Sequence, residues 1–430
     1  MPSYSGKFQY LDASGSAFVD QKTQQGACEI SFDTETCSIT PAAGTPLTFD
    51  LGDIDLLAPA EWDLTLQLFT GNKIQLRQFG PVFGRMCEEL LAAWRDRTVR
   101  CLLLEDLEEV ARFTASANGV PVQIRIYESN LAVLPLNAPA IQWRLAELDS
   151  IAFDPSTYAF NLLSGASKLV IAKLAGQTGE FDQKLSAALT ALRRRSAEAL
   201  HQTFPFLDPG QLQQLVTLAP EGRSVKLSAL AAVHPKLPEA LISRAVDEPL
   251  KPYFDSLRKR AREESLMTGF KFVRPDEVGV GAPAENAAEN GAANPPENQT
   301  ETTAGTKPPL FFWFFFPLAG QDPLAGKDIV AWEATTGSGR ATYFFRAAPP
   351  FEDSIARLTR GLALDNFRRE PIYLPDSSLD QQSEFHRYAI ARRKLPDLAA
   401  LRAAFLGRAA HSSLETWEQQ VAVAFTNQRE

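Results

Sequence analysis

Residues 47–76 read LTFDLGDIDLLAPAEWDLTLQLFTGNKIQL, and residues 141–172 read IQWRLAELDSIAFDPSTYAFNLLSGASKLVIA. The two stretches match at a constant offset of 94 positions. Chance does not sustain such an offset over several apolar and acidic positions. The matching pairs are Phe49 with Trp143, Leu51 with Leu145, Ile54 with Leu148, Asp55 with Asp149 and Leu57 with Ile151. The sequence therefore predicts two copies of one domain.

Each copy changes its hydrophobic period once, from that of a strand to that of a helix. In the first copy, apolar residues alternate over 62–68 and 74–76, on either side of the turn 70–72, which indicates a hairpin of half-buried strands. From Pro81 the apolar residues fall on one helical stripe, with proline at a favourable first-turn position. The stripe contains Val82, Phe83, Met86, Leu90, Leu91 and Trp94.

The second copy repeats this plan with different residues. Alternation over 122–126, 141–145 and 158–162 predicts strands, and LVIAKL (169–174) predicts the last of them. A helix follows from about Glu180 and buries Phe181, Leu185, Leu189 and Leu192. Between the copies, residues 101–119 are expected to form a linking helix that stops near Asn118-Gly119.

Several antiparallel strands closed by one C-terminal helix, twice in tandem, resemble the pleckstrin-homology (PH) superfold. In particular, the arrangement resembles the double PH-like modules of FACT-type histone chaperones, and the resemblance covers about residues 6–204. It rests on element order, on the repeat and on the helices at 81–95 and 180–200. The resemblance implies partial β-barrels that bind proteins or phosphoinositides rather than catalyse. Lipid-binding members use a basic cluster in the first hairpin, where this chain has only Lys22.

The fold class expected is therefore α+β, with six segments. These are a PH-like domain at 1–100, the linking helix at 101–119, a second PH-like domain at 120–204, a helical segment at 205–274, a disordered acidic tether at 275–309 and a C-terminal α/β region at 310–430. The tether lacks bulky apolar residues and carries a net charge of −5.

The C-terminal region is strongly apolar at its start. LFFWFFFPL (310–318) reads as a buried strand, and residues 329–347 read as two strands joined by a turn at 336–339. Helices are expected at about 351–367 and 396–425. A strand so apolar directly after a tether suggests that the region docks on the second repeat. The phrases ATYFFRA (341–347) and NFRREPIYLP (366–375) are similar to segments of uncharacterised bacterial proteins, which implies no function.

Bulk composition excludes several classes of function. The 430 residues have no apolar run of the roughly 18 residues that a membrane helix needs, and the N-terminus lacks the pattern of a secretory signal, so we expect a cytoplasmic protein. A net charge of −9 argues against non-specific nucleic-acid binding. The four cysteines lack metal spacing and are expected to be reduced thiols.

No motif predicts a catalytic residue, a metal site or a cofactor. The segment 320–327 (GQDPLAGK) misses phosphate-loop spacing by one residue and has Asp328 where a hydroxyl is needed. Asp53 and Asp55 would suit acid–base work, but Glu147 and Asp149 replace them in the second copy. A structural role at one turn of the fold explains both pairs more simply.

Basic clusters give the better functional candidates. The residues expected to bind a partner are Arg193, Arg194, Arg195, Arg258, Lys259, Arg260, Arg368 and Arg369, and a further cluster lies at 392–394. The simpler interpretation of such runs is a solvated helix face, and pairing with the acidic tether is a further alternative. We expect a non-enzymatic interaction or scaffold protein that binds another protein. The alternatives are an enzyme with an inter-domain site built from residues such as Asp365, Arg368 and His386, or a weak binder of anionic membranes or nucleic acid.

Overall fold

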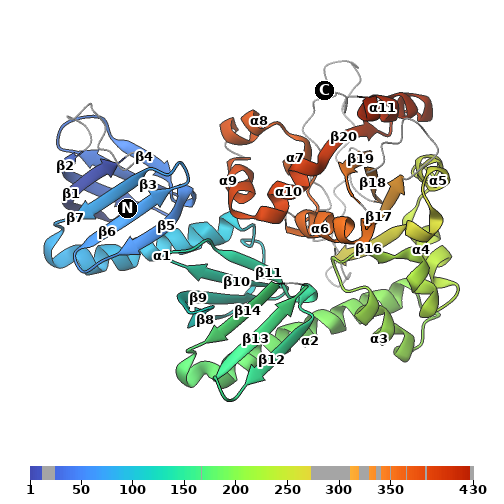
Figure 1. Ribbon diagram of the computed structural model, residues 1–430, viewed down its shortest axis with the longest axis horizontal. Helices are drawn as coiled ribbons and strands as arrows, with labels where there is room; N and C mark the ends of the chain where they lie inside the picture. Colours follow the sequence, from blue (N-terminus) through green and yellow to red (C-terminus); the bar gives the residue numbers. More distant parts are fainter. Residues whose placement is uncertain are drawn as a thin grey trace, which may run out of the picture. The chain divides into compact units, whose positions relative to one another are not determined.

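The computed structural model describes residues 1–11, 25–165, 167–272, 310–318, 329–335, 340–348, 350–364, 366–382 and 385–426 (Figure 1). The chain divides into two compact units. The first unit contains residues 1–190 and 375–396, and the second contains residues 191–374 and 397–430. Both mix helices with antiparallel sheets, which confirms the α+β class.

The first repeat is a seven-stranded antiparallel sheet followed by one long helix. Its strands lie in the order β4-β3-β2-β1-β7-β6-β5. A short 3-10 helix, η1 (Leu51–Asp53), separates β4 from β5, and η2 (Gly80–Val82) leads into helix α1 (Phe83–Cys101). The strands are β1 (Ser3–Leu11), β2 (Gln25–Phe32), β3 (Thr36–Pro41), β4 (Leu47–Asp50), β5 (Ile54–Pro59), β6 (Asp63–Leu68) and β7 (Lys73–Arg77).

The second repeat has the same topology, β11-β10-β9-β8-β14-β13-β12, with η3 (Leu145–Glu147) at the place of η1. Helix α2 (Thr178–Thr203) follows η4 (Ala175–Gln177). The matching strand orders confirm the predicted repeat. The strands are β8 (Glu109–Ala117), β9 (Val120–Tyr127), β10 (Asn130–Pro135), β11 (Ile141–Arg144), β12 (Ser150–Asp154), β13 (Ala159–Ser164) and β14 (Ser167–Ala172).

Alternating side chains build the core of the first repeat. Leu64 and Leu66 of β6 are buried and face the buried stripe of α1, as the two periods predict. Trp94 closes this core, and its indole N–H donates to the carbonyl of Ile54 over 3.1 Å. Val82, expected on the same stripe, is 41% exposed because it precedes the helix in η2.

The prediction of a linking helix at 101–119 is wrong. Helix α1 runs on to Cys101, and β8 then occupies Glu109–Ala117. Asn118 and Gly119 both have positive φ, 49° and 87°, and join β8 to β9. That pair of conformations is the hairpin turn favoured by Asn-Gly, so the dipeptide turns a hairpin instead of ending a helix.

The second unit is built on a third antiparallel sheet, in the order β15-β16-β17-β18-β19-β20. Its strands are β15 (Val225–Lys226), β16 (Met267–Phe272), β17 (Leu310–Leu318), β18 (Ile329–Ala334), β19 (Ala341–Arg346) and β20 (Phe405–Ala410). Its helices are α3 (Pro209–Leu218), α4 (Leu237–Ala245), α5 (Lys251–Arg260), α6 (Phe351–Leu364), α7 (Glu370–Tyr373), α10 (Pro396–Ala404) and α11 (Leu414–Thr426), with 3-10 turns η5 (Leu227–Ala232) and η6 (Glu263–Ser265).

The third sheet joins two segments that the sequence suggests are separate. Strand β17 pairs with β16, which belongs to the segment expected to be helical, and one hydrophobic core contains side chains from both. Strands β17, β18, β19 and β20 of the C-terminal region therefore extend a sheet begun by β15 and β16. The helix expected at 396–425 is interrupted by β20. The tether at 275–309 lies outside the described residues.

One stretch of the C-terminal region belongs to the first unit. Residues 375–396, which we call the strap, contain α8 (Asp376–Gln381) and α9 (His386–Lys394). The chain leaves the second unit at Leu374 and returns to it at Asp397. Nothing in the sequence pattern predicts this insertion.

Candidate interaction surface

Helix α9 packs on a face of the first repeat formed by η1, the start of β5 and the end of α1. The side chains Tyr388, Ala389, Ile390 and Ala391 are buried there. The approach is close at Gly52, where an added Cβ would lie 2.6 Å from the Cys101 sulfur and 2.9 Å from the Cδ1 atom of Ile390. The backbone of η1 comes so near to α9 only because residue 52 has no side chain.

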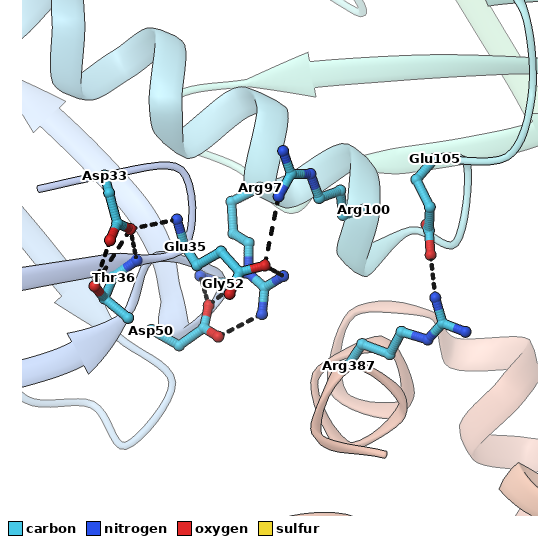
Figure 2. A network of polar contacts seen from close by, with 9 residues as sticks. All are labelled: Asp33, Glu35, Thr36, Asp50, Gly52, Arg97, Arg100, Glu105 and Arg387. Atoms are coloured by element: carbon cyan, nitrogen blue, oxygen red, sulfur yellow. Dashed lines mark hydrogen bonds and ion pairs between the residues drawn. The ribbon is translucent and has the colours of Figure 1, made fainter. Parts of the chain in front are cut away.

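Ion pairs surround this apolar contact. The Arg393 guanidinium lies 2.5 Å from the Asp53 carboxylate. The Lys394 ammonium donates to the Ile54 carbonyl over 3.1 Å and lies 3.4 Å from Asp55. At the other end of α9, Arg387 pairs with Glu105 (Figure 2). We call the three carboxylates Asp53, Asp55 and Glu105 the acidic face.

An aromatic ring adds to the grip on Arg393. Its guanidinium carbon lies 3.7 Å from the centre of the Phe69 ring, which is 42% exposed. A cation over an aromatic face is attracted by the ring quadrupole, by about 0.5–1 kcal/mol at exposed sites. Arg393 is thus held by a carboxylate on one side and by a ring on another.

A second layer of charge holds η1 in place beneath α9. Asp50 caps η1 by accepting from the Gly52 backbone N–H over 2.6 Å, and it also accepts from the Arg97 Nε over 2.8 Å (Figure 2). Arg97 and Arg100 of α1 both approach Glu35, at 3.7 and 3.5 Å. The hydrogen bond to Asp50 raises the pKa of Arg97, so this buried guanidinium stays charged.

The surroundings of the Asp53 carboxyl make its ionised form less favourable than in water. Burial raises its pKa, and the nearby charge of Arg393 lowers it by less. Desolvation disfavours the ionised form and a nearby cation favours it. Asp53 therefore depends on Arg393 for its charge. This pairing, and the contact of Asp55 with Lys394, give both residues the structural role that their counterparts in the second copy suggest.

The predicted partner-binding arginines lie on three separate elements of the second unit. On α2, Arg193 and Arg194 are exposed, and Arg194 lies 3.9 Å from Glu198. Arg195 is half-buried. It pairs with Glu221 at 3.6 Å and lies over the Phe272 ring at 4.8 Å.

The other two clusters also have partners within the chain. On α5, Arg258 pairs with Glu239 and Glu263, Lys259 is exposed, and Arg260 pairs with Glu418. Arg368 and Arg369 are half-buried between α6 and α7 and both make polar or electrostatic contacts. Most of these side chains therefore stabilise the second unit itself.

The enzyme alternative gains no support from the residues suggested for it. His386 begins α9 in the first unit, Arg368 belongs to the second, and Asp365 lies outside the described residues. Within the described ranges, no group of three or more His, Cys, Asp or Glu side chains could hold a metal ion. The segment 320–327 also lies outside those ranges. All four cysteines are buried and unbridged, which confirms the prediction of free thiols.

Among the helices that the structure describes, none combines the length and apolar character needed to cross a bilayer. Sequence reasoning named the cluster at 392–394 but did not connect it with Asp53, Asp55 or Glu105. The only available signal was the opposite charge of the two segments. Comparison of the chain with protein-family models and with curated proteins finds no match.

Proposed function

We propose that this chain is a non-enzymatic, cytoplasmic scaffold that binds another protein through two PH-like repeats. Two features support the PH-like assignment. Each repeat consists of seven antiparallel strands followed by one long helix, and the two stand in tandem. The different side chains of the two repeats would then let each hold a different partner segment.

The observation that carries the proposal is the docking of α9. The first repeat holds a helix whose contacts reach across 282 to 340 residues of the chain, through an apolar patch ringed by ion pairs. A buried centre with a charged rim is the usual anatomy of a protein-binding surface. The repeat thus already works as a binding module within its own chain.

The test is co-purification of the tagged full chain from its native host, washed at low and at high salt. A stoichiometric protein partner identified by mass spectrometry is the expected result. Recovery of a bound small molecule or cofactor without a protein partner contradicts the proposal, since it would point to an active site. The two washes separate partners held by exposed charge from those held by apolar contact.

A further inference from the structure

The two repeats differ in how they treat the last strand of their sheets. β5 ends the first sheet and β12 ends the second, so each has one edge without a neighbouring strand of its own sheet (Figure 1). An edge strand presents backbone donors and acceptors to which another extended chain can pair. Proteins usually cover such edges or place proline there.

The edge of β5 is protected in both ways. The backbone N–H of Leu57 donates to the carbonyl of Leu136 over 2.7 Å, and the Leu136 side chain packs against the core of the first repeat. The strand also ends in Pro59, which has no N–H to offer. A segment of the second repeat therefore occupies the edge of the first.

The edge of β12 has neither protection in the structure. By the offset of 94, Ile151 takes the place of Leu57, and Phe153 that of Pro59. Leu57 pairs with Leu66 of β6, and Ile151 pairs with Leu162 of β13 in the same way. In an antiparallel strand every second residue directs its N–H and C=O away from the neighbouring strand, so part of the β12 backbone faces outward. Within the described ranges, the outer edge of β12 makes no backbone hydrogen bond.

Two exposed aromatic side chains lie beside this edge. Phe153 is 41% exposed and Tyr158 is 64% exposed, and their ring centres are 5.4 Å apart, edge to face. Phe153 also contacts Phe160, a buried residue of the core, at 5.0 Å. The pair forms an apolar platform that continues the core to the surface, as recognition surfaces for extended peptides do.

Charge limits what can occupy the edge. Asp149 and Asp154 flank β12, and hydrogen bonds from Ser156 and Thr157 lower the pKa of Asp154 to about 2, so it is ionised at neutral pH. Antiparallel pairing of two copies about Ala152 would set Ser150 of one opposite Asp154 of the other. Residues 149–155 contain no basic side chain that could pair with either aspartate. A segment with basic residues at its ends is the complementary occupant.

We propose that the β12 edge binds an extended peptide segment of a protein partner by strand addition. The segment places an apolar side chain on Phe153 and Tyr158, and a lysine or arginine near each of Asp149 and Asp154. This inference rests on the proposed scaffold function, because it names the kind of segment that the second repeat holds.

The probe is the synthetic peptide acetyl-Lys-Val-Thr-Val-Tyr-Lys-amide, whose lysines have the same spacing as Asp149 and Asp154. Binding to the full chain is measured by fluorescence anisotropy of a labelled copy, and by hydrogen exchange of the amides of residues 150–154. We expect saturable binding and slower exchange in this segment. A peptide with glutamate at both ends, and one with alternate backbone nitrogens methylated, should each bind about tenfold more weakly or worse.

The key variant is Phe153→Pro, which copies the first repeat's own residue at the equivalent position and removes the backbone N–H of that residue. This substitution should lower the affinity for the peptide at least about tenfold, while the circular dichroism spectrum stays unchanged. Phe153→Thr, which keeps the N–H but removes the ring, should weaken it less. If Phe153→Pro misfolds, the methylated peptide and Phe153→Thr still test the two parts of the interaction. Pro59→Ala is the matched control and should leave binding unchanged.

Three results would overturn the proposal. The first is no slowing of hydrogen exchange in residues 150–154 at millimolar peptide. The second is equal affinity for the methylated and unmethylated peptides. The third is a dimer of the chain that Phe153→Pro dissociates, because a second copy would then occupy the edge. If a protein partner co-purifies equally with the wild-type chain and with Phe153→Pro, the scaffold function stands and β12 is not its site.

Discussion

The carboxylate of Glu333 accepts a hydrogen bond of 2.7 Å from the hydroxyl of Thr342, its register partner in the adjacent strand of the third sheet. Glu333 is fully buried. His411 lies 3.4 Å from the same carboxylate and stacks on Tyr253, and the Trp417 indole donates to Thr342 over 2.9 Å. One acidic side chain thus joins β18 and β19 to α5 and α11.

Removal of this carboxylate should destabilise the second unit. Glu333→Ala removes the carboxylate that accepts from the Thr342 hydroxyl and lies 3.4 Å from His411, and it opens a cavity, so we expect a loss of about 3 kcal/mol in unfolding free energy. Urea unfolding followed by tryptophan fluorescence measures it. Glu415→Ala, at an exposed position of α11, is the control and should change stability by less than about 0.5 kcal/mol. Equal effects would contradict a role for the network.

The pair Asp53–Arg393 should show measurable coupling between the strap and the first repeat. A double-mutant cycle of Asp53→Asn and Arg393→Gln is expected to give a coupling free energy of about 1–2 kcal/mol. Both side chains are mostly buried, since only 17% of Asp53 and 21% of Arg393 is exposed. The exposed pair Arg85–Glu89 serves as control and should show much weaker coupling, because solvent screens it. A coupling near zero for Asp53–Arg393 would mean that apolar contacts alone hold α9.

The buried thiols should be inert in the folded chain. Burial raises the pKa of Cys37 and of Cys101 to about 12, so almost no thiolate forms at pH 8, and the thiolate is the nucleophile. Ellman's reagent should therefore react with these two residues only after denaturant is added. Labelling of either residue in the native protein, located by mass spectrometry, would show that the first repeat opens readily.

Asp154 should titrate well below an ordinary aspartate. Hydrogen bonds from Ser156 and Thr157 lower its pKa from 3.8 to about 2. Since the folded value lies below the unfolded one, its contribution to stability is present above pH 3.8 and is lost as the pH falls toward 2. Carbon-13 NMR of the carboxyl measures the midpoint. Ser156→Ala should move the midpoint upward, and an unchanged midpoint would remove the hydroxyl as the cause.

The repeat could be read from the sequence because apolar side chains recur at the same places in both copies. The hydrophobic pattern predicted the wrong element where it fits a helix as well as a strand. In β8 Ser116 is buried as well as Phe113, Ala115 and Ala117, and alanine is the strongest helix former, so the strand alternation is faint. The sequence preceding it continues a true helix, which reinforced the wrong assignment.

The docking of α9 could not be predicted for a different reason. It joins residues 53–55 and 105 to residues 387–394, and no local rule links segments so distant. The charge runs were visible, but long-range pairing depends on how the chain returns from the second unit. The candidate arginines stand out in the sequence only because basic residues are dense there. A high density of basic residues does not distinguish a binding surface from internal ion pairs.

The strap also bears on biosynthesis. A ribosome adds about 5–20 residues per second, so roughly 10–40 s separate the emergence of residue 190 from that of residue 396. During that interval the nascent first repeat has its carboxylates and its apolar patch in place but lacks the helix that covers them. The exposed patch is available to chaperones, or to the wrong neighbour, until the strap has been synthesised.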